Sequence, residues 1–326
     1  MNKITSILML CFLLTSCGGS KEDKVDNAIL RANLALTRGD CQTAISILEL
    51  QGRQTLNDIY LKTLASSYAC RAGYKTTVLF ATDIPKVTDA ALLLRGLSTF
   101  TTSPNDSFDN LEYVDLQVAL DILLYAGGTL LSQNPTSAIR DEIFGNAGQD
   151  INAFGFYLSF AQLGKFSYFY GNASAVTGIK GTGGVTSTNP CYLDYNANVN
   201  AFLTALSGAG LPTGVCAAGS DDGHPDLVSG VDTVDAARAC EGIVGFNNMV
   251  DTLDSFIASS TSGDFGNLIG IKTAVDVVEA LILVAKPTFD TAIFDTTSQD
   301  RCELLFAGND EDIMYFYAGI FETLHR

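Results

Sequence analysis

Apolar residues recur at helical spacing soon after the first twenty residues of the chain. The first such stripe consists of Val25, Ile29, Ala32 and Leu36. Residues at i, i+4, i+7 and i+11 share one face of a helix, so this stripe predicts a helix that stops at Gly39-Asp40. A second helix, carrying Ala44, is expected to stop at Gly52, and a third to run from about Thr55 to Ala72.

Helical patterns continue through the rest of the chain. They mark residues 111–126, 152–170, 232–259, 271–285 and 309–324, and we expect Asn309 to cap the last of these helices, with Asp312 three residues on. Alternating apolar and polar runs bounded by hairpin turns, which would indicate strands, are scarce. The predicted fold class is all-α, built from antiparallel helical hairpins that form either a solenoid or an irregular bundle.

The N-terminal helices show an internal period of 34 residues. The pairs at this distance are Ala35 and Ala69, Gly39 and Gly73, and Ala44 and Val78. A period of 34 with helix–turn–helix content is typical of the tetratricopeptide (TPR) repeat. Residues 35–45 resemble the turn of that repeat, in which a Gly-Asp turn is followed by an aromatic and then by a small residue.

The TPR likeness is partial. Cys41 stands at the position of the aromatic residue, and the Trp-x-x-Leu-Gly opening is absent. Residues 160–164 read as a further echo of the start of a repeat helix. The resemblance implies stacked helical hairpins with a concave surface that holds peptides or partner proteins. The alternative is a plain antiparallel bundle whose glycine spacing is accidental.

Two later segments leave alternatives open. Residues 154–170 concentrate Phe and Tyr side chains, which favours a place in the core over the lining of a ligand pocket. Residues 171–192 are rich in Gly, Ser and Thr but lack the Gly-Lys-Ser/Thr ending of a phosphate-binding loop. We expect a long loop that is either a flap over a pocket or a tolerated insertion.

The first seventeen residues combine a positive start with an apolar run too short to span a bilayer. Lys3 is followed by a run of 11 residues from Ile4 to Leu14. Leu14-Thr15-Ser16-Cys17 then resembles the lipobox of bacterial lipoproteins. The resemblance implies cleavage before Cys17, acylation of Cys17 with lipid such as palmitate, and stable anchoring in the membrane. An ordinary secretory signal with a chance cysteine is the alternative.

The residue after Cys17 indicates in which membrane the lipoprotein is anchored. Gly18 stands there in place of the Asp that tends to retain enterobacterial lipoproteins in the inner membrane, so we expect the outer membrane, with the protein facing the periplasm. The sequence divides into a signal peptide (1–16), a lipidated tether (17–23), a TPR-like helical region (24–170), the Gly/Ser/Thr-rich loop (171–192) and a C-terminal helical region packed on the first (193–326).

Six cysteines remain after the signal and the lipid site: Cys41, Cys70, Cys191, Cys216, Cys240 and Cys302. An even number in an exported chain favours disulfides. Antiparallel neighbours bring the start of helix 41–51 beside the end of helix 55–72, so Cys41 is expected to pair with Cys70. For the other four, proximity in sequence weakly favours Cys191–Cys216 and Cys240–Cys302. Six buried free thiols are the alternative.

Composition and charge exclude several classes of protein. The 326 residues hold 19 Lys+Arg and 36 Asp+Glu, for a net charge of −17 and a pI of about 4.3. Such a surface repels phosphate backbones, which excludes a nucleic-acid binder of the usual kind. Disorder is excluded as well, since 47% of residues are hydrophobic and only 17% are charged.

Candidate chemistry is sparse. Asp221, Asp222 and Asp226 surround His224 and are weak metal-ligand candidates, because the spacing of an EF-hand is missing. The other histidine, His325, is penultimate and is expected to be frayed, which argues against a Ser-His-Asp triad. We expect no cofactor and no enzymatic activity, although paired carboxylates of a hydrolase leave a small residual chance.

These observations favour a membrane-anchored binding or scaffold lipoprotein. Its partners would be the lipid bilayer, through Cys17, and another envelope protein or a peptide held on the TPR-like surface. An alternative is an accessory solute-binding subunit of a TRAP-type transporter, a family whose length, lipid anchor and cryptic TPR motifs are similar. A purely structural envelope lipoprotein is a third possibility.

Overall fold

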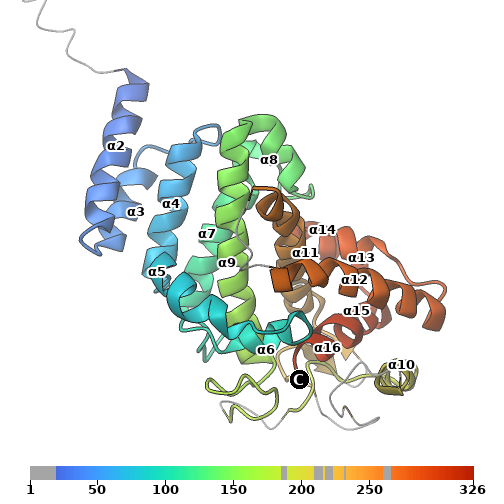
Figure 1. Ribbon diagram of the computed structural model, residues 1–326. Helices are drawn as coiled ribbons and strands as arrows, with labels where there is room; N and C mark the ends of the chain where they lie inside the picture. Colours follow the sequence, from blue (N-terminus) through green and yellow to red (C-terminus); the bar gives the residue numbers. More distant parts are fainter. Residues whose placement is uncertain (1–19, 185–188, 209–215, 217–222, 231–232, 260–265) are drawn as a thin grey trace, which may run out of the picture.

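The computed structural model describes residues 20–184, 189–208, 216, 223–230, 233–259 and 266–326. The chain is mostly helical, which confirms the predicted all-α class (Figure 1). The helices of the first half are α2 (Lys21–Leu36), α3 (Cys41–Glu49), α4 (Asp58–Arg71), α5 (Thr76–Val78), α6 (Leu93–Ser98), α7 (Leu111–Leu124), α8 (Ser137–Phe144) and α9 (Asn146–Tyr170).

The second half continues with helices and one small sheet. Its helices are α10 (Ala197–Gly208), α11 (Ala236–Ser259), α12 (Gly266–Ala285), α13 (Ala292–Asp295), α14 (Gln299–Phe306), α15 (Asp310–Phe316) and α16 (Glu322–Leu324). Within the described ranges, β1 (Val228–Gly230) and β2 (Thr233–Val234) pair as a short antiparallel ribbon. Helical patterns predicted from the sequence therefore correspond to α2, α3, α4, α7, α9, α11, α12 and α15.

Helix α2 begins with a capping box at its first turn. The Ser20 hydroxyl accepts the Asp23 N–H at 3.0 Å, and the Asp23 carboxylate accepts the Ser20 N–H at 2.7 Å. The segment 17–23, expected to be a tether, is therefore helical from Lys21 onward. The folded body begins only a few residues after Cys17, which itself lies outside the described residues.

The 34-residue period corresponds to two turns with the same backbone conformation. Gly39 (φ 73°) and Gly73 (φ 79°) each lie after a helix in the left-handed region, which glycine adopts without steric cost. Helices α2, α3 and α4 pack on one another in succession, with Ala44 completely buried. The second copy is irregular: after α5 the chain forms a π-helical turn (Leu79–Asp83) and a 3₁₀ turn that contains Pro85.

Helix α9 is the centre of the molecule. It packs against α6, α7 and α8 on the N-terminal side and against α11 on the C-terminal side, as Figure 1 shows. Phe156, Phe160 and Tyr170 are fully buried within one continuous apolar core. The aromatic segment 154–170 is therefore core, as the sequence favoured, and the C-terminal region packs on the first through this helix.

The segment after α9 is part of the folded body. Lys180 forms a buried ion pair with Glu322, whose other oxygen accepts the Tyr192 N–H and the Tyr195 hydroxyl, both at 2.8 Å. The described part of the 171–192 loop is thus fastened to the last helix. This ion pair joins the loop to a helix that lies 142 residues further along the chain.

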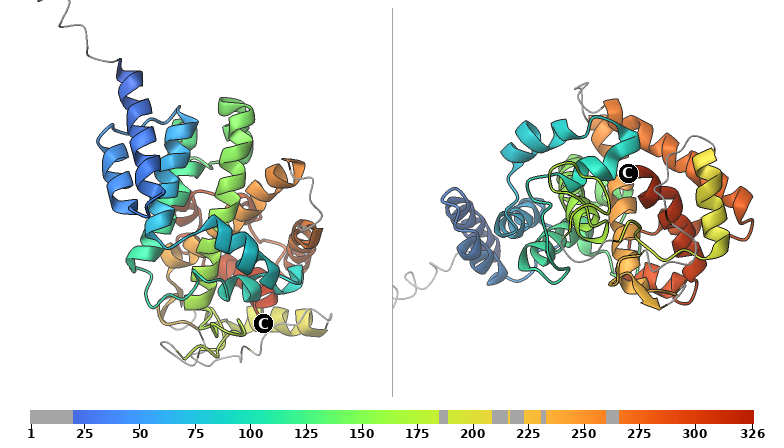
Figure 2. Two further views of the ribbon diagram at one scale, coloured as in Figure 1. Left: turned by 60° about the vertical axis from the view of Figure 1, so that its left-hand side comes forward. Right: turned by 90° about the horizontal axis from the view of Figure 1, so that it is seen from below.

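The prediction that His325 is frayed is wrong. The ring is completely buried: Nε2 donates to the Gly178 carbonyl at 2.9 Å and Nδ1 accepts from the Tyr192 hydroxyl at 2.5 Å. Burial, with the nearby Lys180 ammonium, lowers the pKa of His325 to about 3, so the ring is neutral. The chain end packs against α6 and residues Ala90–Leu92 (Figure 2). Tertiary contacts here override the usual fraying of a terminus.

The described residues form three disulfides, and each joins a predicted pair. Cα–Cα distances are 5.7 Å for Cys41–Cys70, 5.8 Å for Cys191–Cys216 and 5.8 Å for Cys240–Cys302. The first pair joins the start of α3 to the end of α4, the antiparallel arrangement from which it was predicted.

Asn309 occupies the N-cap position of α15, but its side chain makes no cap hydrogen bond. It donates instead to the Asp312 carboxylate. The expected position of the cap is right and the expected hydrogen bond is wrong.

None of the described helices is long and apolar enough to cross a membrane.

Candidate binding groove

A groove of about 630 Å³ lies between α7, α11 and α14. We call it the α7–α11 groove. Its lining consists of Phe108, Tyr113, Val114, Gln117, Val118, Leu120, Asp121, Leu124, Tyr125, Leu131, Asp235, Ala237, Arg238, Glu241, Val244, Gly245, Asn248, Thr297, Gln299, Asp300 and Glu303. The volume is in the range of sites that hold a small ligand or a few side chains of a partner.

Helical spacing places these residues together. On α7, Val114, Val118, Asp121 and Tyr125 follow one another at i, i+4, i+7 and i+11, on the face opposite the core residues of that helix. On α11, Glu241, Val244 and Asn248 repeat the pattern. The Cys240–Cys302 disulfide, with Cα atoms 5.8 Å apart, fastens α14 to α11 beside the groove. Most of the walls therefore belong to helices, whereas Leu131 and Thr297 line the groove from connecting segments.

A polar cluster occupies one part of the groove. The Tyr113 hydroxyl donates to Glu241 Oε2 at 3.0 Å, and Arg238 Nη1 donates to Glu241 Oε1 at 2.6 Å. The guanidinium also lies over the Phe108 ring, 3.6 Å from its centroid. Burial raises the pKa of Glu241, although Arg238 and Tyr113 both favour its ionised form.

Acidic groups outnumber basic groups in the lining. Its carboxylates are those of Asp121, Asp235, Glu241, Asp300 and Glu303. Arg238 is the sole cation in the set, and Glu241 neutralises it. Burial raises the pKa of Asp121 to about 6 even though the Gln117 amide donates to the carboxylate at 2.9 Å. The groove therefore has a negative potential and holds a carboxylate that titrates just below neutral pH.

Asn248 and Thr297 both line the groove and contact each other. The Asn248 amide nitrogen donates to the carbonyl oxygens of Val244 and Thr297, both at 2.9 Å. Among the residues that the structure describes, the Asn248 Oδ1 and the Thr297 Oγ1 have no hydrogen-bond partner, although both atoms are buried. Two oxygen atoms that can accept hydrogen bonds thus lie unused in residues that line the groove.

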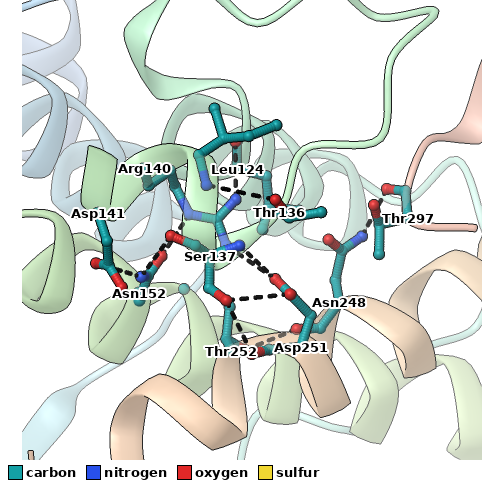
Figure 3. Close-up of polar contacts among 12 residues, drawn as sticks. Leu124, Thr136, Ser137, Arg140, Asp141, Asn152, Asn248, Asp251, Thr252 and Thr297 are labelled. Atoms are coloured by element: carbon teal, nitrogen blue, oxygen red, sulfur yellow. Dashed lines mark hydrogen bonds and ion pairs between the residues drawn. The ribbon is translucent and has the colours of Figure 1, made fainter. Parts of the chain in front are cut away.

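A buried arginine fixes the end of α7 behind this wall (Figure 3). Arg140 is 1% exposed; its Nη1 donates to the Leu124 carbonyl at 3.0 Å and its Nη2 lies 3.3 Å from Asp251 Oδ2. Its Nε donates to Asn152, and the Ser137 N–H donates to the same Asp251 oxygen at 2.7 Å. This network joins α7, α8, α9 and α11, because α8 supplies Ser137 and Arg140 and each of the other helices supplies one member.

The pKa of Arg140 shows what this burial costs. Removal from water lowers it to about 10, while the Asp251 carboxylate opposes the shift. The guanidinium stays charged at neutral pH and stays paired, so the network is a structural support of the groove rather than a reactive group.

A second hollow, of about 680 Å³, lies between α10, α15 and the end of α12. Its charged groups are already paired: Lys286 lies 3.0 Å from Glu311 and 2.6 Å from Asp312. In the α7–α11 groove, by contrast, Asn248 Oδ1 and Thr297 Oγ1 have no hydrogen-bond partner among the residues that the structure describes.

The weak metal candidates are not brought together in the described structure. Asp221 and Asp222 lie outside the described residues, and the Asp226 carboxylate is partly exposed, 4.0 Å from the His224 ring. In the described part of the chain, one group of possible ligands lies close together, namely Cys191, Cys216 and Glu322. Its two sulfurs are bonded to each other and so provide no thiolate.

Little in the amino-acid sequence indicated the groove. Asp121, Glu241 and Asn248 belong to no motif, and none was a predicted site residue. The available signal was α7 itself, because a helix that is apolar on most of its surface is expected to pack against other elements on more than one face.

Comparison of the chain with protein-family models, with curated proteins and with solved structures gave no match.

Proposed function

We propose that this chain is a binding or scaffold lipoprotein of the cell envelope, anchored through acylated Cys17 and holding a segment of a protein or peptide partner in the α7–α11 groove. The observation that carries the proposal is the groove itself, which has apolar walls, five carboxylates against one arginine, and two buried oxygens without a hydrogen-bond partner among the described residues. The lipobox likeness supports the anchor, and Gly18 supports the outer membrane, facing the periplasm.

The TPR likeness supports the same class of function. The repeated Gly39 and Gly73 turns and the stacked α2, α3 and α4 are consistent with a short TPR-like array. The groove lies outside this array, because its walls come from α7 and later elements. We therefore assign partner binding to the groove and treat the N-terminal hairpins as the part that joins it to the anchor.

Obstruction of the groove tests the proposal. Val114 lines the groove and is 42% exposed, so Val114→Trp fills space without disturbing the core. Leu111 is also exposed on α7 but does not line the groove, which makes Leu111→Trp the matched control. Cross-linking and pull-down from solubilised envelopes should recover a partner with the wild type and with Leu111→Trp, but not with Val114→Trp. Equal recovery with both variants would place the partner elsewhere.

A solute is the second candidate occupant. A volume of about 630 Å³ is sufficient for a small molecule, which is the role expected of an accessory subunit of a TRAP-type transporter. Mass spectrometry of the purified lipidated protein distinguishes the two, because a solute-binding subunit should release a bound small molecule that Val114→Trp does not carry. A structural envelope lipoprotein should yield neither a solute nor a groove-dependent partner.

A further inference from the structure

We propose that the Asn248–Thr297 end of the α7–α11 groove is a subsite for an organic cation with N–H donors on an apolar stem, such as the side chain of a lysine or arginine. The inference rests on the proposed function, since it names the chemistry of the group that the groove holds.

The first observation is the pair of unused acceptors. Asn248 is 1% and Thr297 4% exposed, and both line the groove. The Asn248 amide is fixed in orientation because its nitrogen donates twice to the backbone, at 2.9 Å each. Its Oδ1 and the Thr297 Oγ1 are left without a donor among the described residues. A buried acceptor without a partner is costly, so a ligand that supplies N–H groups is favoured here.

The second observation is the sign of the charge. Carboxylates from α7 and α14 line the same groove, including those of Asp121, Asp300 and Glu303. The one lining cation, Arg238, is already paired with Glu241 at 2.6 Å. An ammonium or guanidinium group therefore meets a surplus of negative charge, whereas an anionic ligand would be repelled.

The third observation is the surface beside these groups. Leu124, Tyr125, Leu131 and Val244 line the groove together with Asn248. Lysine and arginine place a hydrocarbon stem against apolar surface and a charged head against polar groups, which matches this arrangement. An inorganic cation fits less well, because the described part of the groove has no three carboxylates whose oxygens converge to metal-ligand distance.

Short peptides of one host sequence test the proposal with the full chain in detergent. The host consists of Ala and Leu, and its central residue is Lys, norleucine or Glu; binding is followed by the fluorescence anisotropy of a dye on the peptide. We expect the Lys peptide to bind about tenfold more tightly than the norleucine peptide, and the Glu peptide to bind more weakly than either. Pentylamine and pentanol are used as competitors. They show whether a small amine binds without a peptide, since pentanol has the same stem and no charge.

Two variants assign the preference to named atoms. Thr297→Val removes only the unused hydroxyl, and Asp121→Asn removes one groove carboxylate, so both should reduce the preference for Lys over norleucine severalfold. Asp276→Asn is the control, because Asp276 is an exposed acid on α12 outside the groove and its replacement changes the net charge equally. Thermal unfolding measured for each variant shows whether it is folded.

Each outcome decides the proposal. Equal binding of the Lys and norleucine peptides, blocked by Val114→Trp, would overturn the cation subsite and leave the groove as the binding site. If pentylamine binds and the Lys peptide does not, the result would support the subsite and would indicate that a small solute supplies the cation. If neither peptides nor pentylamine bind at millimolar concentration, the subsite is wrong. The pull-down with Val114→Trp then tests the proposed function independently of the cation subsite.

Discussion

At the scale of single residues, Asp121 shows the conflict between folding and binding most clearly. Asp121 is half-buried, and partial removal of its carboxylate from water is a cost to the fold that raises its pKa to about 6 from the ordinary value of 3.8. A carboxyl whose pKa is higher in the folded chain than in the unfolded chain makes its full contribution to stability at pH values below the unfolded pKa. That contribution is lost as the pH rises through the folded pKa.

We therefore expect Asp121→Asn to stabilise the protein near pH 8, by about 1–2 kcal/mol once the partial exposure of the side chain is allowed for, and to have little effect near pH 4. Urea unfolding at the two pH values measures the difference. The Arg53 guanidinium, from another segment of the chain, opposes this rise in the pKa of Asp121, as does the hydrogen bond from the Gln117 amide. A gain in stability that is equal at both pH values would contradict the assignment of the titration to Asp121.

Ala44 tests the packing of the first hairpin. Its side chain is completely buried between α3 and its neighbours, so Ala44→Leu should overpack the site and cost about 1–3 kcal/mol of the free energy of unfolding. The adjacent Thr43 is exposed, and Thr43→Leu is the control. The comparison is made by thermal unfolding. If the two variants unfold at the same temperature, Ala44 is not at the helix–helix contact.

At the scale of elements, the Cys41–Cys70 disulfide joins α3 to α4. It links positions 29 residues apart in the sequence. In the chain-entropy account of disulfides, a loop of this length contributes roughly 3 kcal/mol to stability. The double variant Cys41→Ser/Cys70→Ser should lose stability of that order in denaturant unfolding.

The connectivity itself is measured by non-reducing peptide mapping. A peptide containing Cys41 should be recovered linked to the peptide containing Cys70. A free Cys41 thiol, or a link from Cys41 to any other cysteine, would contradict both the pairing and the antiparallel arrangement of α3 and α4.

At the scale of the whole molecule, the charges are divided unequally along the chain. Residues 20–95 hold 10 Lys+Arg and 8 Asp+Glu, whereas residues 96–326 hold 8 and 28. Anionic lipid headgroups repel the second part far more than the first. A lipid on Cys17 would therefore place the N-terminal hairpins near the membrane and the acidic groove away from it.

Cys17→Ser tests the anchor. The variant should incorporate no labelled palmitate and should remain uncleaved by the lipoprotein peptidase, because the thioether that the enzyme requires cannot form. Metabolic labelling followed by gel electrophoresis gives the result, and Cys11→Ser in the apolar run is the control. Palmitate labelling of Cys17→Ser would show that the lipobox interpretation is wrong.

The sequence by itself determined the local structure. Apolar stripes predicted the helices, because the faces of a helix are set by neighbours three and four residues apart. Gly39 and Gly73 predicted turns that only glycine adopts without cost, and adjacent antiparallel helices predicted Cys41–Cys70. These features depend on short stretches of chain, which is why they could be inferred without the fold.

Two features depend on the tertiary structure alone: the groove and the burial of the C-terminal residues. Arg140 meets Asp251 across 111 residues and Tyr192 meets His325 across 133. No local periodicity encodes such pairings, since they arise from the way α9 packs between the two halves. Asp121, Asn248 and Thr297 become a candidate site only when α7, α11 and the segment before α14 meet. The physical reason is that burial is a property of the packed molecule: it raises the pKa of Asp121, and it leaves Asn248 Oδ1 and Thr297 Oγ1 without a partner among the described residues.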